Sequence, residues 1–273
     1  MVEKSGRTTM QNIGIAIYSG VSFKKQAEYF KKLGVTSTFI GSETADFDGV
    51  VTTFADNGIV CESLHAPYKN INDMWSSDET VAQTMLGRLK DSVDKCAKYS
   101  IPVSVVHLSS GVPMPEINEL GIARFEELFS YAEEKGVKIA LENQRFLENL
   151  SFFLDRYPNV GFCWDAGHEY GFTHGINFMD MYGNRAIALH IHDNRAGINT
   201  DDHLLPFDGK IDFNEVAGKL VRNGYTGTIM LEISKEVAID GKKVYADLTE
   251  EEYMDRAYSA VKKLAVMVEE LKK

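Results

Sequence analysis

Eight short apolar runs alternate with longer amphipathic runs along nearly the whole sequence. The short runs predict β-strands at residues 12–18, 35–40, 59–65, 102–108, 138–143, 160–165, 186–192 and 228–233. Several of the runs between them carry apolar residues three and four apart, which predicts helices. Four of these runs end in a glycine of the kind that terminates helices: Gly34, Gly58, Gly136 and Gly224.

This alternation favours one fold. Strands that are connected through helices pair in parallel by right-handed crossovers, and eight parallel strands can close into a barrel. The chain has 273 residues, an ordinary length for such a barrel, and no linker or low-complexity run divides it. We therefore predict an α/β protein with a single domain, residues 1–273, that folds as a (β/α)8 TIM barrel. A doubly wound open sheet is the alternative, but no GxGxxG turn follows the first predicted strand.

Charge and composition exclude some functions. The formal net charge is -11 and the pI is about 5.2, so a general affinity for nucleic acid is not expected. The first residues contain no apolar signal segment, and no run of about 18 apolar residues predicts a membrane span. Three cysteines without CxxC spacing, Cys61, Cys96 and Cys163, fit a reducing compartment, so a cytoplasmic location is expected.

Ionisable residues lie at the ends of six successive predicted strands. They are His65, His107, Glu142, Asp165, His190 and Glu232. Because side chains alternate between the two faces of a strand, the bulkier apolar face packs on the outer helices and these residues point into the barrel. The C-terminal ends of barrel strands are where active sites form. Carboxylates gathered there would repel one another, and a divalent cation with interleaved imidazoles resolves that conflict. These ligand types suit zinc, manganese or a related metal.

Further polar residues flank the predicted strands. His168 follows Asp165 by three residues, and Asp201 and His203 lie two residues apart, so they are either further ligands or parts of surface polar clusters. His192 and Asp193 are either groups that orient the ligands or ordinary polar residues of the barrel mouth. His174 is predicted to lie in a surface loop. Trp75 either caps a pocket or packs against its own loop.

The strand-end motifs resemble a known family. "SLHAPY", "VVHLSSG", "ALENQ", "GFCWDAGH", "LHIHDN", "DDHLLPFDGKIDF" and "MLEIS" occur in the order and at the strand ends seen in the xylose-isomerase-like barrel superfamily. That superfamily includes sugar phosphate isomerases and epimerases, ketose 3-epimerases and endonuclease IV. The resemblance covers nearly the whole chain and is clearest from the third predicted strand to the eighth.

Two branches of this superfamily imply different metal sites. The ketose-epimerase branch implies one metal held by Glu142, Asp165, His190 and Glu232, with His168 and Glu148 in contact with the substrate. The endonuclease IV branch implies three zinc ions. Its pattern places His65, His107 and Glu142 on the first metal, makes Glu142 a bridge to a second held by Asp165, His190 and Glu232, and puts His168, Asp201 and His203 on the third.

The expected activity is that of a metal-dependent isomerase or epimerase acting on a sugar or sugar phosphate, with one to three metal ions per chain. Glu142 and Glu232 would act as acid and base while the metal stabilises an enediolate. The segments 68–83 and 194–203 are not notably basic, and 203–213 resembles the pattern of sugar isomerases, so a small carbohydrate is favoured over nucleic acid. The alternatives are an endonuclease IV-like multi-zinc AP endonuclease, and a barrel that binds a ligand without catalysis. The sequence leaves open whether the chain forms a homo-oligomer.

Overall fold

The computed structural model describes residues 11–173, 176–195, 197 and 199–273, so His174 lies outside the described residues. Eight strands form one sheet in the order β7-β6-β5-β4-β3-β2-β1-β8, and every neighbouring pair in it is parallel. Their bounds are β1 (Ile13–Ile15), β2 (Ser37–Gly41), β3 (Val60–His65), β4 (Val103–Val106), β5 (Lys138–Glu142), β6 (Gly161–Asp165), β7 (Ala186–His190) and β8 (Ile229–Leu231). All eight predicted strands are therefore present.

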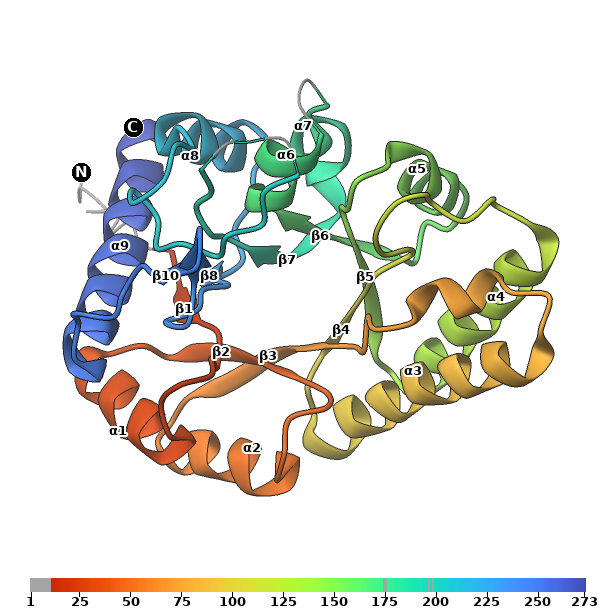
Figure 1. Ribbon diagram of the computed structural model, residues 1–273, viewed down its shortest axis with the longest axis horizontal. Helices are drawn as coiled ribbons and strands as arrows, with labels where there is room; N and C mark the ends of the chain where they lie inside the picture. Colours follow the sequence, from red (N-terminus) through yellow and green to blue (C-terminus); the bar gives the residue numbers. More distant parts are fainter. Residues whose placement is uncertain (1–10, 174–175, 196, 198) are drawn as a thin grey trace, which may run out of the picture.

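The first and last strands of this order meet through a single residue beyond β7. Ile191 forms an isolated parallel bridge with Leu231. Its amide donates to the carbonyl of Met230 at 2.9 Å, and its carbonyl accepts from the amide of Glu232 at 3.0 Å. This contact brings β7 and β8 together, so the sheet curls into the predicted TIM barrel (Figure 1).

Helices surround the strands (Figure 1). Their bounds are α1 (Phe23–Leu33), α2 (Phe47–Asp56), α3 (Glu79–Tyr99), α4 (Glu119–Glu134), α5 (Leu147–Arg156), α6 (Ala166–Phe172), α7 (Phe178–Tyr182), α8 (Phe213–Arg222) and α9 (Glu250–Leu271). Two 3-10 helices, η1 (Ile71–Trp75) and η2 (Gly183–Arg185), and a small antiparallel pair, β9 (Ala238–Ile239) and β10 (Lys242–Lys243), lie in the connections. Gly34, Gly58, Gly136 and Gly224 all have positive φ at helix C-termini, as predicted.

Helix α6 has no counterpart among the predicted helices. It is only seven residues long and begins directly after β6. Its N-cap is Asp165, whose side chain accepts a hydrogen bond from the His168 amide at 2.6 Å. A helix that depends on a strand-end carboxylate for its first turn gives little apolar periodicity to detect.

The barrel interior is formed by two small groups of buried side chains, separate from the main core beneath the helices. Val103, Val105, Ala140, Cys163 and Ala188 make one group, and Ala16, Phe39 and Met230 make the other. Side chains such as Leu141, Trp164 and Leu189 instead belong to the main core. The residues two positions before Glu142, Asp165, His190 and Glu232 are thus interior residues, as the alternation predicts.

One residue departs from that alternation. Strict alternation would place Ile187 on the outer face with Leu189, but it packs against the interior group. The pairing of β6 with β7 steps from Phe162–Ala186 to Cys163–Ala188, which leaves Ile187 as an extra residue. Such a bulge turns one side chain against the period of the strand. A Cβ on Gly161 would lie 2.2 Å from the Ile187 side chain, so the glycine makes room for it.

Trp75 packs beneath its own loop, one of the two placements predicted from the sequence. It is 5% exposed, and its indole Nε1 donates to the carbonyl of Leu108 at 2.7 Å. Its ring lies directly against Gly121 in the first turn of α4. Among the described helices, none combines the length and the apolarity that a membrane-crossing segment requires.

The contact between Gly121 and Trp75 predicts a measurable loss of stability. An alanine Cβ at position 121 would lie 2.1 Å from the indole ring, so we expect Gly121→Ala to lower the free energy of unfolding. The expected cost is about 1–3 kcal/mol, in the range of overpacked cores. Urea denaturation measures it.

Gly87→Ala is the matched control. Gly87 is an exposed residue inside α3, and a Cβ there would meet no atom within 4 Å. The same substitution should therefore raise the free energy of unfolding by up to about 1 kcal/mol, through helix propensity alone. Equal effects at the two glycines would contradict the packing argument.

Candidate metal centre

Glu142 lies at the middle of a buried cluster of imidazoles. Its Oε2 atom is 3.3 Å from His65 Nε2, 3.2 Å from His107 Nε2 and 3.3 Å from His190 Nδ1. Its Oε1 atom is 3.1 Å from His168 Nδ1. Glu232, just beyond β8, approaches the same His190 Nδ1 to 3.3 Å. Side chains from β3, β5, β7 and the segments after β4 and β8 therefore converge at the C-terminal mouth of the barrel.

A second cluster adjoins the first through His168. His168 Nε2 lies 3.4 Å from Asp201 Oδ2, and Asp201 Oδ1 lies 3.2 Å from His203 Nε2. His192 Nε2 is 3.2 Å from Asp165 Oδ1, and the His192 ring stacks on His203 with 4.3 Å between centroids. The structure thus brings all nine sequence-predicted ligands into two connected clusters. It also adds His192 as a direct neighbour of Asp165, where sequence reasoning had left its place open.

Glu148 is placed differently from the other candidates. It lies exposed in the first turn of α5, after the loop that follows β5. Its contact with a substrate stays a prediction.

Backbone carbonyls fix the orientation of two imidazoles. His65 Nδ1 lies 2.8 Å from the carbonyl of Ala66, and His203 Nδ1 lies 3.1 Å from the carbonyl of Glu232. A carbonyl can only accept, so the proton resides on Nδ1 in each ring and Nε2 faces the cluster. This is the arrangement that holds histidine ligands in metal sites.

The charges of the clusters compensate one another. Burial alone would raise the pKa of the Glu142 carboxyl, but its attraction to His107 and His190 outweighs burial and holds the pKa well below its usual range. Asp201 shows the same balance, with hydrogen bonds from His168 and His203 lowering its pKa. Burial lowers the pKa of His203, but Asp201 and Glu232 raise it to about 9. Glu142 and Asp201 are therefore ionised beside imidazoles, and a divalent cation can supply the compensating positive charge in place of protons.

Unpartnered polar atoms provide a test of fit for a cation. Among the described residues, His107 Nδ1, Asp165 Oδ2 and both ring nitrogens of His190 and of His192 are buried without a hydrogen-bond partner. Buried polar atoms without partners cost free energy and call for a ligand. Several sets of three donor atoms, among them His65–His107–Glu142 and Asp165–His168–His192, lie within 4.8 Å of one another. Imidazole and carboxylate donors in such sets fit a divalent metal site.

Cys163 also lies beside this cluster, between Glu142 and His190. Burial raises the pKa of its thiol to about 12. Without a metal the thiol therefore stays protonated, and Cys163 packs in the interior group with Ala140 and Ala188. Cys61, Cys96 and Cys163 are all unpaired in the structure.

Several residues that support the site were not identified from sequence. Gln144 Nε2 lies within 3.1–3.2 Å of Glu142 Oε1, His107 Nε2 and His168 Nδ1. The Asn143 side chain exchanges two hydrogen bonds, both 2.8 Å, with the backbone of Asp165. The motif "ENQ" after β5 was a usable signal, since two amides directly follow a strand-end carboxylate.

The loop after β7 is held by its own polar network. Asp193 is buried and accepts hydrogen bonds from the backbone amides of Asn194, Gly209 and Ile211. Asn194 Oδ1 accepts from the amide of Asp202 at 2.6 Å. Asp193 therefore shapes the loop backbone, and Asn194 positions the segment that carries Asp201 and His203.

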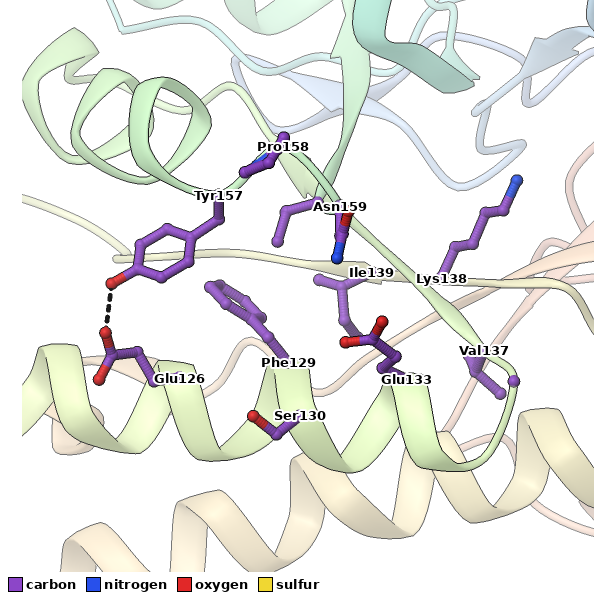
Figure 2. A pocket seen from close by; sticks show the side chains of 12 residues that line it. Glu126, Phe129, Ser130, Glu133, Val137, Lys138, Ile139, Tyr157, Pro158 and Asn159 are labelled. Atoms are coloured by element: carbon purple, nitrogen blue, oxygen red, sulfur yellow. Dashed lines mark hydrogen bonds between the residues drawn. The ribbon is translucent and has the colours of Figure 1, made fainter.

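A large cavity of about 790 Å³ lies away from this centre. It is lined by residues of α4, by the beginning of β5 and by the segment between α5 and β6, among them Phe129, Ile139 and Tyr157 (Figure 2). This is the N-terminal end of the strands, opposite the clustered ligands. Figure 2 shows Glu126 bonded to Tyr157 at its edge. The ligand clusters, and not the size of a cavity, identify the candidate site.

Comparison with known proteins agrees with this geometry. The profile of the xylose isomerase-like TIM barrel family matches residues 24–266. The chain belongs to this family. Over 237 residues, 78% of this chain and 73% of the relative, it is 28% identical to the uncharacterised protein y4fM of Sinorhizobium fredii.

Solved structures share the fold. D-psicose 3-epimerase from Clostridium cellulolyticum H10 has a TM-score of 0.74 at 17% identity and covers 94% of this chain and 99% of its own. An L-ribulose 3-epimerase has a TM-score of 0.73 at 16% identity, covering 96% and 95%. IolI with a bound zinc atom has a TM-score of 0.73 at 19% identity, covering 94% and 99%. Sugar epimerases are thus among the structural neighbours, and at these identities the likeness shows the fold.

The metal content of the protein tests the site directly. Protein purified without chelator should contain at least one divalent transition metal per chain by elemental analysis, because the buried donors fit a cation. If Asp201 and His203 hold a further metal, Asp201→Asn with His203→Ala should lower the count by about one. The centre around Glu142 should stay occupied in that variant. A wild-type barrel that takes up neither zinc nor manganese on titration would contradict the site.

Metal affinity should rise with pH. His203, with a pKa of about 9, holds a proton at neutral pH when no metal is bound. Coordination needs the neutral imidazole, so binding at this residue must release that proton. Below pH 9 the apparent association constant should increase about tenfold per pH unit for each proton released. Chelator competition across this range measures the slope, and a flat profile would show that no protonated imidazole takes part.

Proposed function

We propose that the protein is a metal-dependent isomerase or epimerase of a sugar or sugar phosphate. The observation that carries this proposal is the placement of two glutamates around one imidazole. Glu142 Oε2 and Glu232 Oε2 each lie 3.3 Å from His190 Nδ1, and they come from strands on opposite sides of β7 in the barrel order. Two carboxylates that approach one point are what proton removal and return at a single carbon require.

Glu142, Asp165, His190 and Glu232 would hold the principal cation in this proposal. His65 and His107 add donors on one side, and His168, Asp201 and His203 add them on the other. A divalent metal bound there supplies a Lewis acid that polarises a substrate carbonyl and favours enediolate formation. Whether that metal is zinc or manganese is a question for elemental analysis.

The two glutamates differ in their access to solvent. The side chain of Glu142 is fully buried, whereas that of Glu232 is 18% exposed. Glu232 can therefore exchange its proton with water, and Glu142 is shielded from it by the surrounding imidazoles. Gln144 donates to Glu142 Oε1 and holds that carboxylate in place. This difference in exposure suits an acid–base pair in which one carboxyl group exchanges its proton with solvent and the other does not.

The second cluster favours one alternative. His168, Asp201 and His203 would complete a three-metal set, and an endonuclease IV-like phosphodiesterase would use such a set. A protein that acts on DNA must also neutralise several phosphates. The net charge of -11 argues against that, and Arg195 beside the mouth is already paired with Asp202 at 3.0 Å.

Substitution of either glutamate tests the proposal. Glu142→Gln and Glu232→Gln should each reduce turnover of a ketose or aldose substrate by at least about a hundredfold, because a proton-transfer group is lost. Reaction in deuterated water should label the product carbon. Metal content is measured in parallel, so that loss of the cation is distinguished from loss of the proton acceptor.

Glu133→Gln is the matched control. Glu133 is an exposed carboxylate on α4, and it borders the cavity at the opposite end of the strands. It should leave turnover unchanged. Efficient incision of an abasic duplex, with no deuterium exchange on any sugar tested, would overturn the proposal in favour of the phosphodiesterase.

A further inference from the structure

Arg145 lies at the rim of the metal centre, three residues after Glu142 and directly after Gln144. Its guanidinium Cζ is 3.8 Å from the centroid of the Phe172 ring at the end of α6. Phe172 in turn stacks on His168, with 4.8 Å between centroids and 20° between planes. A guanidinium and an imidazole at these distances cannot share one face of the phenyl ring without overlapping. Arg145 and His168 therefore lie on opposite faces of the Phe172 ring, and Arg145 lies between the loops that follow β5 and β6.

The donors of Arg145 are not satisfied by the described part of the chain. Its Nε is buried and has no hydrogen-bond partner there. The described residues also place no carboxylate within 4.0 Å of its guanidinium. Other arginines differ: Arg124 pairs with Glu79 at 2.7 Å and Arg222 with Asp180 at 2.7 Å. Stacking uses the face of a guanidinium and leaves its edge, with the N–H donors, available.

The helix that follows Arg145 adds to the positive potential. Helix α5 begins at Leu147, and its N-cap residue, Phe146, provides no side-chain hydrogen bond to the first turn. Free amides at a helix N-terminus attract anions. Glu148 in the same turn is exposed, where solvent and salt screen its charge.

We propose that Arg145 forms a subsite for an oxyanion carried by the substrate, at the end of the molecule remote from the reacting carbon. This rests on the proposed function and narrows it, since the substrate is then a sugar phosphate or a sugar acid and not a neutral sugar. A planar guanidinium recognises phosphate or carboxylate through two parallel hydrogen bonds, which a hydroxyl group cannot match. A fixed cation at the rim gives an anionic substrate its orientation relative to the metal centre.

Equilibrium binding to the full-length, metal-loaded protein tests the subsite without requiring turnover. The probes are fructose 6-phosphate, glucuronate and fructose, measured by isothermal titration calorimetry. Wild-type protein should bind one of the two anionic probes at least tenfold more tightly than fructose. Comparison of fructose 6-phosphate with glucuronate shows whether the subsite binds a phosphate or a carboxylate. Equal affinity for all three probes would overturn the proposal.

Variants assign the preference to Arg145. Arg145→Gln should remove about tenfold to a hundredfold of the preference for the anionic probe, as expected for a charged hydrogen bond, and leave fructose binding and metal content unchanged. Arg145→Lys should restore part of it, because the charge returns without the two-pronged geometry. Retention of the full preference in Arg145→Gln would contradict the subsite.

Arg156→Gln is the matched control. Arg156 stacks on Phe152 at 3.9 Å at the C-terminal end of α5, the helix that follows Arg145. It should leave the preference unchanged, and any change in thermal stability common to both variants reports the lost stacking. Deuterium exchange separates the two proposals. If deuterium exchange occurs with neutral sugars alone, the Arg145 subsite is wrong and the isomerase proposal stands. If binding of the anionic probe depends on Arg145 but no sugar exchanges deuterium, the subsite stands and the isomerase proposal is wrong.

Discussion

The burial of Glu142 is the constraint on which the mouth of this barrel depends. A fully buried carboxylate is too costly to keep unless opposite charges surround it. Here four imidazoles, from His65, His107, His168 and His190, face its two oxygens. Each imidazole comes from a different strand or connection. The compensation of this one carboxylate therefore involves side chains from half of the barrel's strand ends. The same balance makes the centre a place for a cation.

The scaffold beneath the centre gives the ligands their places. Small residues such as Ala140 and Ala188 fill the interior below Glu142 and His190, while Phe39 stacks on the His190 ring at 4.6 Å. The Asn143 side chain ties the end of β5 to the end of β6. Asp165 caps α6 with Oδ1 and leaves Oδ2 unpartnered toward the cluster. Packing, helix capping and ligand orientation are thus served by the same few residues, so substitutions here would disturb all three together.

Access to the centre is uneven, and this bears on how a substrate could enter. The side chains of Asp201 and His203 are 35% and 30% exposed, whereas those of His107 and His190 are almost wholly buried. The open side is therefore the loop after β7, which Asp193 and Asn194 hold by hydrogen bonds to its backbone. Arg145 lies on a different part of the rim, beyond Phe172.

Period and order along the chain were enough to predict the strands, the barrel and the six ionisable residues at the strand ends, whereas His168, Asp201 and His203 were implied as ligands only by the family resemblance. This is because a strand alternates its faces every residue, so a polar residue that ends an apolar strand has only one face to occupy. Helix α6, the turned side chain of Ile187 and the contacts of Gln144, His192 and Arg145 could not be predicted in this way. Helix α6 is too short to show periodicity, the side chain of Ile187 depends on the space above Gly161, and Arg145 depends on the ring of Phe172. Local periodicity carries no information about such pairings, which arise only when the strands close and bring the loops side by side.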